Sequence, residues 1–128
     1  MKITHIGLWT EHLEELKTFY TTWFKGTSHE KYTNPRKGFS SYFIRFEGEV
    51  SLELMSRAGI RESRTPGEEV MGFAHLAFSV GSPEEVTALT EQLREAGYTV
   101  AGEPRTTGDG FFESVVLDPD GNRIELTV

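Results

Sequence analysis

The strongest constraint on the fold is a pattern of expected strands and helices that occurs twice along the chain. Each half opens with a short strand that has a histidine at its centre, His5 in the first half and His75 in the second. An amphipathic helix and three further strands follow, and the last strand carries one glutamate, Glu53 or Glu125. The two histidines, like the two glutamates, are separated by about 70 residues, as equivalent positions of a repeat would be. The sequence therefore predicts one βαβββ module used twice.

The hydrophobic pattern sets the expected bounds of these elements. In the first half, strands are expected at 2–9, 29–32, 40–46 and 50–55 and a helix at 10–24; in the second half, strands are expected at 73–80, 98–101, 111–117 and 122–128 and a helix at 82–96. Thr10 and Ser82 are the expected N-caps, because their hydroxyls can accept hydrogen bonds from free N–H groups of the first turn. Residues 103–110 are expected to form a loop.

The domain organisation follows from this pattern. We expect a single α+β domain over residues 1–128, with a first module at 1–57, a linker at 58–72 and a second module at 73–128. Gly59, Pro66 and Gly67 interrupt any periodicity in the linker. If each sheet curls around its helix, the opposite face is concave and can hold a site.

An acidic, cysteine-free composition limits the partners and the chemistry. The formal net charge is −7 and the pI about 5.1, which argues against nucleic acid or an anionic membrane as a partner. The absence of cysteine excludes a disulfide framework, a thiolate nucleophile and a thiolate metal site. No apolar run is long enough to span a bilayer and the first residues do not resemble a signal peptide, so a cytoplasmic protein is expected.

Four residues stand out as candidate metal ligands: His5, Glu53, His75 and Glu125. Each lies on the less apolar face of its strand, inside a segment where an unpaired charge is unfavourable. One strand histidine alone is more simply explained as a core residue bonded to backbone, and one glutamate alone as an exposed side chain. Because the same types recur at matching places of two repeats, we expect a site for one divalent transition metal: nickel, cobalt, zinc, manganese or ferrous iron.

Other residues are weaker candidates for substrate contacts. Trp9, Phe43 and Phe111 could form an apolar pocket wall, although strand aromatics usually belong to the core. Arg57, together with Arg61 and Arg64, could bind an anionic substrate group, although a solvated loop is the favoured interpretation of these arginines. His29 follows a turn and could reach a pocket, although a surface position is the favoured interpretation.

The chain resembles the glyoxalase/bleomycin-resistance family, also called the vicinal-oxygen-chelate superfamily. The segments that carry the resemblance are THIGL at 4–8, FY at 19–20, GFAHLAFSV at 72–80 and DPDGNRIEL at 118–126. The resemblance implies paired βαβββ modules that form a cupped half-barrel sheet around a metal, with the helices on the outer face. It also implies a homodimer, as in many short members of the family.

The family's ligand sets point to one branch of it. Fosfomycin-resistance enzymes and extradiol dioxygenases use two histidines and one glutamate, which correspond to His5, His75 and Glu125. Glyoxalase I-like isomerases add a fourth ligand at the end of the first module, where Glu53 stands. Members that only bind bleomycin typically lack this metal set.

The resemblance implies a metal-dependent isomerase or lyase that acts on a small α-hydroxycarbonyl or thiohemiacetal-like substrate through an enediolate. Glu125 is the expected proton-transferring carboxylate, with Glu53 as its near-equivalent across the pseudo-twofold axis. Bacterial glyoxalase I commonly has an arginine and an asparagine for glutathione at two places that Trp9 and Arg57 occupy here. The alternatives are a metal-dependent resistance thiol transferase, an extradiol dioxygenase, and a resistance protein that binds a small molecule without chemistry.

Overall fold

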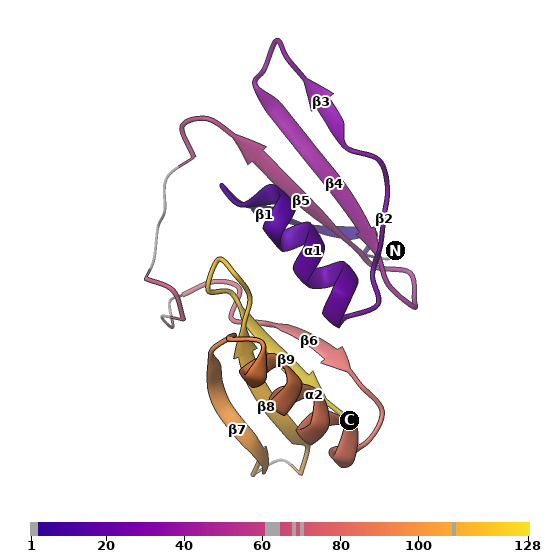
Figure 1. Ribbon diagram of the computed structural model, residues 1–128, viewed down its shortest axis with the longest axis vertical. Helices are drawn as coiled ribbons and strands as arrows, with labels where there is room; N and C mark the ends of the chain where they lie inside the picture. Colours follow the sequence, from indigo (N-terminus) through magenta and orange to yellow (C-terminus); the bar gives the residue numbers. More distant parts are fainter. Residues whose placement is uncertain (1–2, 61–64, 68, 70, 109) are drawn as a thin grey trace. The chain divides into compact units, whose positions relative to one another are not determined.

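The chain forms two compact units, Met1–Glu62 and Ser63–Val128, each a sheet with one helix (Figure 1). The computed structural model describes residues 3–60, 65–67, 69, 71–108 and 110–128. Arg61 and Arg64 of the expected linker lie outside the described residues. Sheets and helices occur together in both units, so the expected α+β fold class is confirmed.

Unit 1 is a five-stranded sheet with helix α1 packed on one face. Its elements are β1 (His5–Trp9), α1 (Leu13–Trp23), β2 (Thr27–Ser28), β3 (Tyr32–Asn34), β4 (Phe39–Arg45) and β5 (Ser51–Arg57). The strands lie in the order β1-β5-β4-β2, and β3 also pairs with β4. β1 runs parallel to β5, while β4 is antiparallel to β5, β2 and β3.

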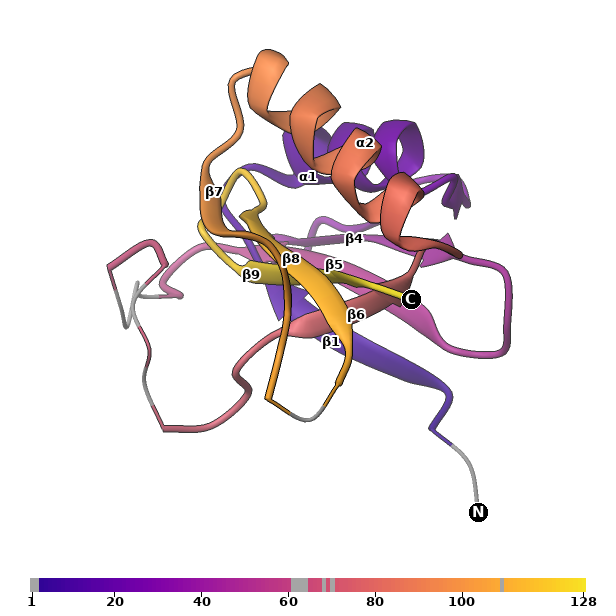
Figure 2. The same ribbon diagram turned by 90° about the horizontal axis from the view of Figure 1, so that it is seen from below.

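Unit 2 repeats this arrangement with four strands. Its elements are β6 (Leu76–Ser79), α2 (Pro83–Glu95), β7 (Val100–Thr106), β8 (Phe112–Leu117) and β9 (Arg123–Thr127). The order is β6-β9-β8-β7, with β6 parallel to β9 and the other pairs antiparallel. Helix α2 packs against β7, β8 and β9 on one face of the sheet (Figure 2).

The core of each unit lies between the sheet and its helix. In β5, Leu52 and Leu54 are buried against α1, while Glu53 and Met55 alternate with them on the other face. In unit 2 the core residues of the strands are Val116, Ile124 and Leu126. The side of each sheet that faces away from its helix is therefore the open face, and the candidate ligands lie there.

The strand register confirms that the two halves are built alike. Gly7 of β1 pairs with Glu53 of β5, and Ala77 of β6 pairs with Glu125 of β9. In each unit the glutamate is opposite the residue that comes two positions after the histidine. Repeat-equivalent side chains thus occupy the same place on the two open faces.

Several expected bounds differ from the observed ones. β6 begins at Leu76, so His75 directly precedes the strand instead of lying inside it. The cap of α1 is His12 and not Thr10, whose Oγ1 accepts a hydrogen bond from the His12 N–H at 2.8 Å. Ser82 caps α2 as expected, since its Oγ accepts the N–H of Glu85 at 3.3 Å.

The expected loop at 103–110 is wrong in its first part, because β7 extends to Thr106. β7 lies at the edge of its sheet, and its pairing with β8 contains two register irregularities. An edge strand tolerates the proline at position 104, which has no N–H to donate. Likewise, the single strand expected at 29–32 is two short strands, β2 and β3. Among the described residues, no helix has the length and apolar character that crossing a membrane requires.

Candidate metal centre and pocket

The open face of unit 1 brings His5 and Glu53 together. His5 is the first residue of β1, and Glu53 lies at the centre of the neighbouring strand β5. The His5 Nε2 atom is 3.7 Å from Glu53 Oε2, and the two side chains are 45% and 19% exposed. The Phe43 ring, on the next strand, meets the His5 ring edge-on at a centroid distance of 5.4 Å. The pair is thus half-buried on its apolar side and open to a ligand on the other.

The orientation of the His5 ring is set by its neighbour Thr4. The Thr4 Oγ1 atom lies 3.1 Å from His5 Nδ1, within hydrogen-bond distance. If Nδ1 carries the proton and donates to this hydroxyl, Nε2 keeps its lone pair on the side of Glu53. This is the tautomer that a metal-binding imidazole needs.

Unit 2 holds the corresponding pair, His75 and Glu125. The His75 Nε2 atom is 3.5 Å from Glu125 Oε2, and the side chains are 44% and 17% exposed. These values nearly repeat those of unit 1, although the surrounding side chains differ. Val115, a buried residue of β8, is opposite Glu125, where Phe43 is opposite Glu53 in unit 1.

Each pair supplies an imidazole nitrogen and a carboxylate oxygen, the donors that borderline divalent metals accept. Two donors bound to one ion at about 2.1 Å lie roughly 3.0–3.4 Å apart, so each pair fits an ion after a small adjustment. Two donors do not complete a site, however. Among the described residues, no group of three or more His, Cys, Asp or Glu side chains is gathered closely enough to hold a metal. Each unit therefore carries one pair of candidate metal ligands, called a half-site below.

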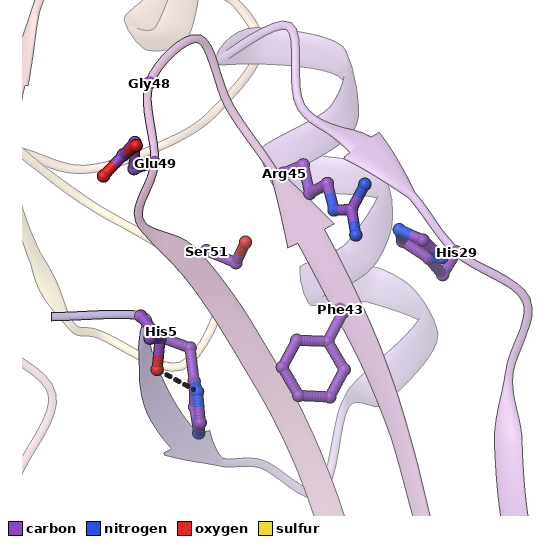
Figure 3. A pocket seen from close by; sticks show the side chains of 8 residues that line it. His5, His29, Phe43, Arg45, Gly48, Glu49 and Ser51 are labelled. Atoms are coloured by element: carbon purple, nitrogen blue, oxygen red, sulfur yellow. Dashed lines mark hydrogen bonds between the residues drawn. The ribbon is translucent and has the colours of Figure 1, made fainter. Parts of the chain in front are cut away.

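An open pocket of about 640 Å³ lies beside the half-site of unit 1 (Figure 3). Its lining includes His5, Phe43, Ser51, Arg45 and His29, which come from β1, β4, β5 and the residue after β2. The Phe43 ring lies between the His5 end of the pocket and the Arg45 end (Figure 3). The pocket thus combines a ligand half-site, an apolar wall and a polar far end.

Farther along the open face of unit 1, Trp9 and Arg57 form a second cluster. The Arg57 guanidinium lies over the Trp9 ring at 5.3 Å from its centroid, and the Phe39 ring packs edge-on against Trp9 at 6.3 Å. Met55 separates this cluster from the half-site, because its Cε atom fills the space above Gly7. Trp9 is 42% exposed and available for contact with a ligand.

The structure thus brings together part of the predicted set. In unit 1, His5, Glu53 and Phe43 lie together, and Trp9 and Arg57 contact each other. In unit 2, His75 and Glu125 lie together, and Phe111 is an exposed residue just before β8. Sequence reasoning missed Arg45 and set His29 aside as a surface residue. The signal for Arg45 was its spacing of two from Phe43 in one strand, which puts both side chains on the same face.

Comparison with known proteins places this geometry in a family. The profile of the glyoxalase/bleomycin resistance protein/dioxygenase superfamily matches residues 2–126. A relative in Bacillus subtilis (strain 168), YqjT, which is described as uncharacterized, is 29% identical over 125 residues, or 95% of this chain and 94% of YqjT.

Two solved structures illustrate the similarity of fold. Glyoxalase I of Zea mays matches with a TM-score of 0.79 and 24% identity, over 98% of this chain and 44% of the maize chain. The trypanothione-dependent glyoxalase I of Leishmania major matches with a TM-score of 0.77 and 24% identity, over 99% of this chain and 86% of that one. The chain therefore spans less than half the length of the maize enzyme. With its repeated modules and a family profile that covers nearly its whole length, the chain belongs to the glyoxalase/bleomycin resistance protein/dioxygenase superfamily.

Proposed function

We propose that the protein is a divalent-metal-dependent isomerase or lyase of the glyoxalase I type, acting on a small oxygenated substrate. The observation that carries this proposal is the duplicated His–Glu pair, with separations of 3.7 and 3.5 Å at repeat-equivalent positions. A purely structural role would not require the same two residue types at the same register in both sheets. Two imidazoles and two carboxylates are a suitable set of ligands for nickel, cobalt, zinc, manganese or iron.

In this proposal, His5, Glu53, His75 and Glu125 hold the metal. The metal would polarise a carbonyl or hydroxyl oxygen of the substrate and stabilise negative charge that develops there. Glu125 takes the proton from the carbon that bears the hydroxyl group and returns it to the former carbonyl carbon, while the hydroxyl proton passes to the former carbonyl oxygen, so that an α-hydroxycarbonyl substrate isomerises through an enediolate. Glu53 is the equivalent carboxylate of the other unit and acts as a ligand that can share this role.

The substrate would lie against the open face of unit 1. Phe43 provides an apolar wall beside the half-site, and Trp9 with Arg57 provides a flat contact surface farther along. We also propose that Phe111, an exposed residue just before β8 of unit 2, contacts the substrate. The Arg57 guanidinium already lies over Trp9, so the two residues at the family's glutathione positions contact each other. We further propose, from the resemblance alone, that the protein works as a homodimer.

The first test of the proposed chemistry is Glu125→Gln. Metal-loaded wild type, incubated in deuterated water with α-hydroxycarbonyl compounds and thiohemiacetals, should incorporate deuterium at the carbon next to the carbonyl. The variant should lose at least about a hundredfold in this rate, because an amide cannot accept the proton. NMR spectroscopy measures the exchange.

Glu113→Gln is the matched control. Glu113 lies on the same open face of unit 2, but its carboxylate pairs with Arg105 at 3.3 Å and not with a histidine. The control should exchange deuterium like the wild type. Exchange at the wild-type rate in Glu125→Gln would refute the role of Glu125, and loss in Glu53→Gln alone would transfer that role to Glu53.

A further inference from the structure

We propose that Arg45 and His29 form an anion-binding subsite at the far end of the unit 1 pocket. This subsite extends the proposed function and rests on it. If both hold, the substrate carries a carboxylate or phosphoryl group. The reacting oxygen would lie at the half-site of His5 and Glu53, and the anionic group would lie at Arg45.

The strand register places these residues in neighbouring rows on one face. Ser51 of β5 pairs with His5 on one side and with Arg45 on the other, so the three form a row across the sheet. Glu53 and Phe43 form the neighbouring row, because they pair across β5 and β4. His29 extends this row, since its backbone N–H donates a hydrogen bond to the Phe43 carbonyl at 3.0 Å. Arg45 and His29 therefore belong to the same face as the half-site, and both line the pocket.

The charge of Arg45 is available for a ligand. Over the part of the chain that the structure describes, its guanidinium has no carboxylate within ion-pair distance, and its side chain is exposed. Glu49 also lines the pocket, but its side chain points away from the Arg45 guanidinium (Figure 3). In a protein with a net charge of −7, an uncompensated arginine inside a pocket favours an anionic ligand. Its planar fork matches a carboxylate or phosphoryl group.

The size of the pocket limits the ligand to a small molecule. His5 and Arg45 are two strand spacings apart, which puts their backbones roughly 10 Å from each other. The volume of about 640 Å³ is within the usual range for small-molecule sites. The Ser51 hydroxyl and the Phe43 ring lie between the two ends. One molecule with a reacting oxygen at one end and an anion at the other can contact both.

Among the described residues of unit 2, the position equivalent to Arg45 is not cationic. Arg123 corresponds to Ser51, and its partner on β8 is Leu117, so an apolar residue stands where unit 1 has Arg45. The His–Glu pair is repeated in both units, but an arginine at the Arg45 position is not. Arg123, at the Ser51 position of unit 2, lies 3.6 Å from a Glu69 carboxylate oxygen and so already has an acidic partner. Such a difference suits a substrate that is not itself symmetric, because only one of its ends needs an arginine.

Anion binding by the metal-free protein tests the subsite without relying on a metal or on turnover. Inorganic phosphate and acetate are titrated separately into wild type, Arg45→Ala, His29→Ala and Arg36→Ala, with NMR detection of the arginine and histidine side chains. Arg36 lies in the turn between β3 and β4 and is not part of the pocket lining, so its variant removes the same charge elsewhere in unit 1.

We expect saturable binding of at least one anion in wild type and Arg36→Ala. Loss of one charge-assisted contact should weaken it about tenfold or more in Arg45→Ala and by a smaller factor in His29→Ala. Phosphate binding without acetate binding would identify the group as phosphoryl, and the converse as carboxylate. An absence of binding in the wild type, or equal binding in Arg45→Ala and Arg36→Ala with all folds intact by circular dichroism, would overturn the subsite.

A second experiment asks whether the subsite serves the substrate. Nickel-loaded protein is titrated with dihydroxyacetone phosphate and with dihydroxyacetone, which share the hydroxycarbonyl group and differ in the phosphate. A phosphoryl subsite predicts a preference for the phosphate ester of about tenfold or more, absent in Arg45→Ala. If acetate is the anion that binds, 5-hydroxy-4-oxopentanoate and 1-hydroxybutan-2-one replace this pair, because they share the hydroxycarbonyl group and differ in the carboxylate. Equal affinity of the wild type for the anionic and the neutral compound would overturn the link between the subsite and the substrate. Anion binding by a wild type that shows no deuterium exchange would refute the proposed function and leave the subsite intact.

Discussion

His5 illustrates how single contacts prepare a ligand at the residue scale. The Thr4 hydroxyl lies at Nδ1, the Phe43 ring meets the edge of the imidazole, and Glu53 faces Nε2. These three contacts fix the ring plane and leave one nitrogen directed at the open face. Because such neighbours also select the tautomer, they affect metal affinity without touching the metal.

Replacing Thr4 with valine should therefore weaken metal binding. The substitution keeps the shape of the side chain but removes the oxygen that Nδ1 contacts. We expect a fall in affinity of about tenfold or more, measured by competition with a chelator of known affinity. Thr33→Val is the control, because the hydroxyl of Thr33 in β3 contacts Ser40 in β4 and does not contact a candidate metal ligand. Equal affinity in Thr4→Val and wild type would show that Thr4 does not orient His5.

Residue type, spacing and the repeat were enough to single out His5, Glu53, His75 and Glu125, but not the far end of the pocket. The pairing of each histidine with the glutamate of its own unit comes from the structure, in which His75 directly precedes β6. Arg45 needed the register of β4 against β5, which depends on how the turn at 47–49 closes. His29 needed the pairing of β2, a strand of two residues, which is too short to show a pattern.

At the scale of elements, a polar cluster ties helix α1 to its sheet. The Glu14 carboxylate of α1 accepts hydrogen bonds from Lys31 Nζ at 2.8 Å and from Tyr42 Oη at 3.0 and 3.1 Å. The bond from Lys31 is the main reason that the pKa of Glu14 lies below its ordinary value of 4.5; the Tyr42 hydroxyl adds to this, and burial opposes it. Lys31 comes just before β3 and Tyr42 lies in β4, so the cluster joins three elements.

This cluster predicts how stability depends on acid. A carboxyl group whose pKa is lower in the folded state stabilises the fold above its ordinary value and loses that contribution as the pH falls through the folded value. The free energy of unfolding should therefore fall below about pH 4.5 more steeply in wild type than in Glu14→Gln. Urea unfolding at a series of pH values measures this. The effect should be small, because the Glu14 side chain is 60% exposed.

Glu15→Gln is the control for the acid dependence. Glu15 neighbours Glu14 in the first turn of α1, so both variants remove one negative charge from the positive end of the helix dipole. In this control, the free energy of unfolding should fall below about pH 4.5 as steeply as in the wild type. If the free energy of unfolding falls equally steeply with acid in wild type and Glu14→Gln, the cluster does not contribute to the pH dependence of stability.

The sequence predicted the order of the elements better than their ends. Long periodic segments such as α2 have a clear start, because Ser82 caps the helix and Pro83 suits its first position. β7 was read as a loop after position 102 because its proline and glycine are rare inside sheets, and only its place at an edge explains them. Thr10 was a reasonable cap from its side chain, yet its hydroxyl accepts the N–H of His12 and the helix begins later.

At the scale of the whole molecule, the repeat gives each unit one His–Glu pair of candidate metal ligands. His5 and Glu53 belong to unit 1, and His75 and Glu125 belong to unit 2. The pocket of unit 1, by contrast, is lined by Arg45 at the register position that the apolar Leu117 occupies in unit 2. In the proposed function, the repeated His–Glu pairs serve the chemistry and the unrepeated pocket lining serves specificity. The central proposal is that these four His and Glu side chains are all ligands of one metal.

Metal content tests that claim most directly. Wild type, His5→Ala, Glu53→Ala, His75→Ala and Glu125→Ala are loaded with nickel, desalted and measured by elemental mass spectrometry, with Glu113→Ala as the control from the open face. The account predicts about one nickel per chain in wild type and control, and a large loss in variants of both units. No metal in the reconstituted wild type, or loss confined to the variants of one unit, would contradict it.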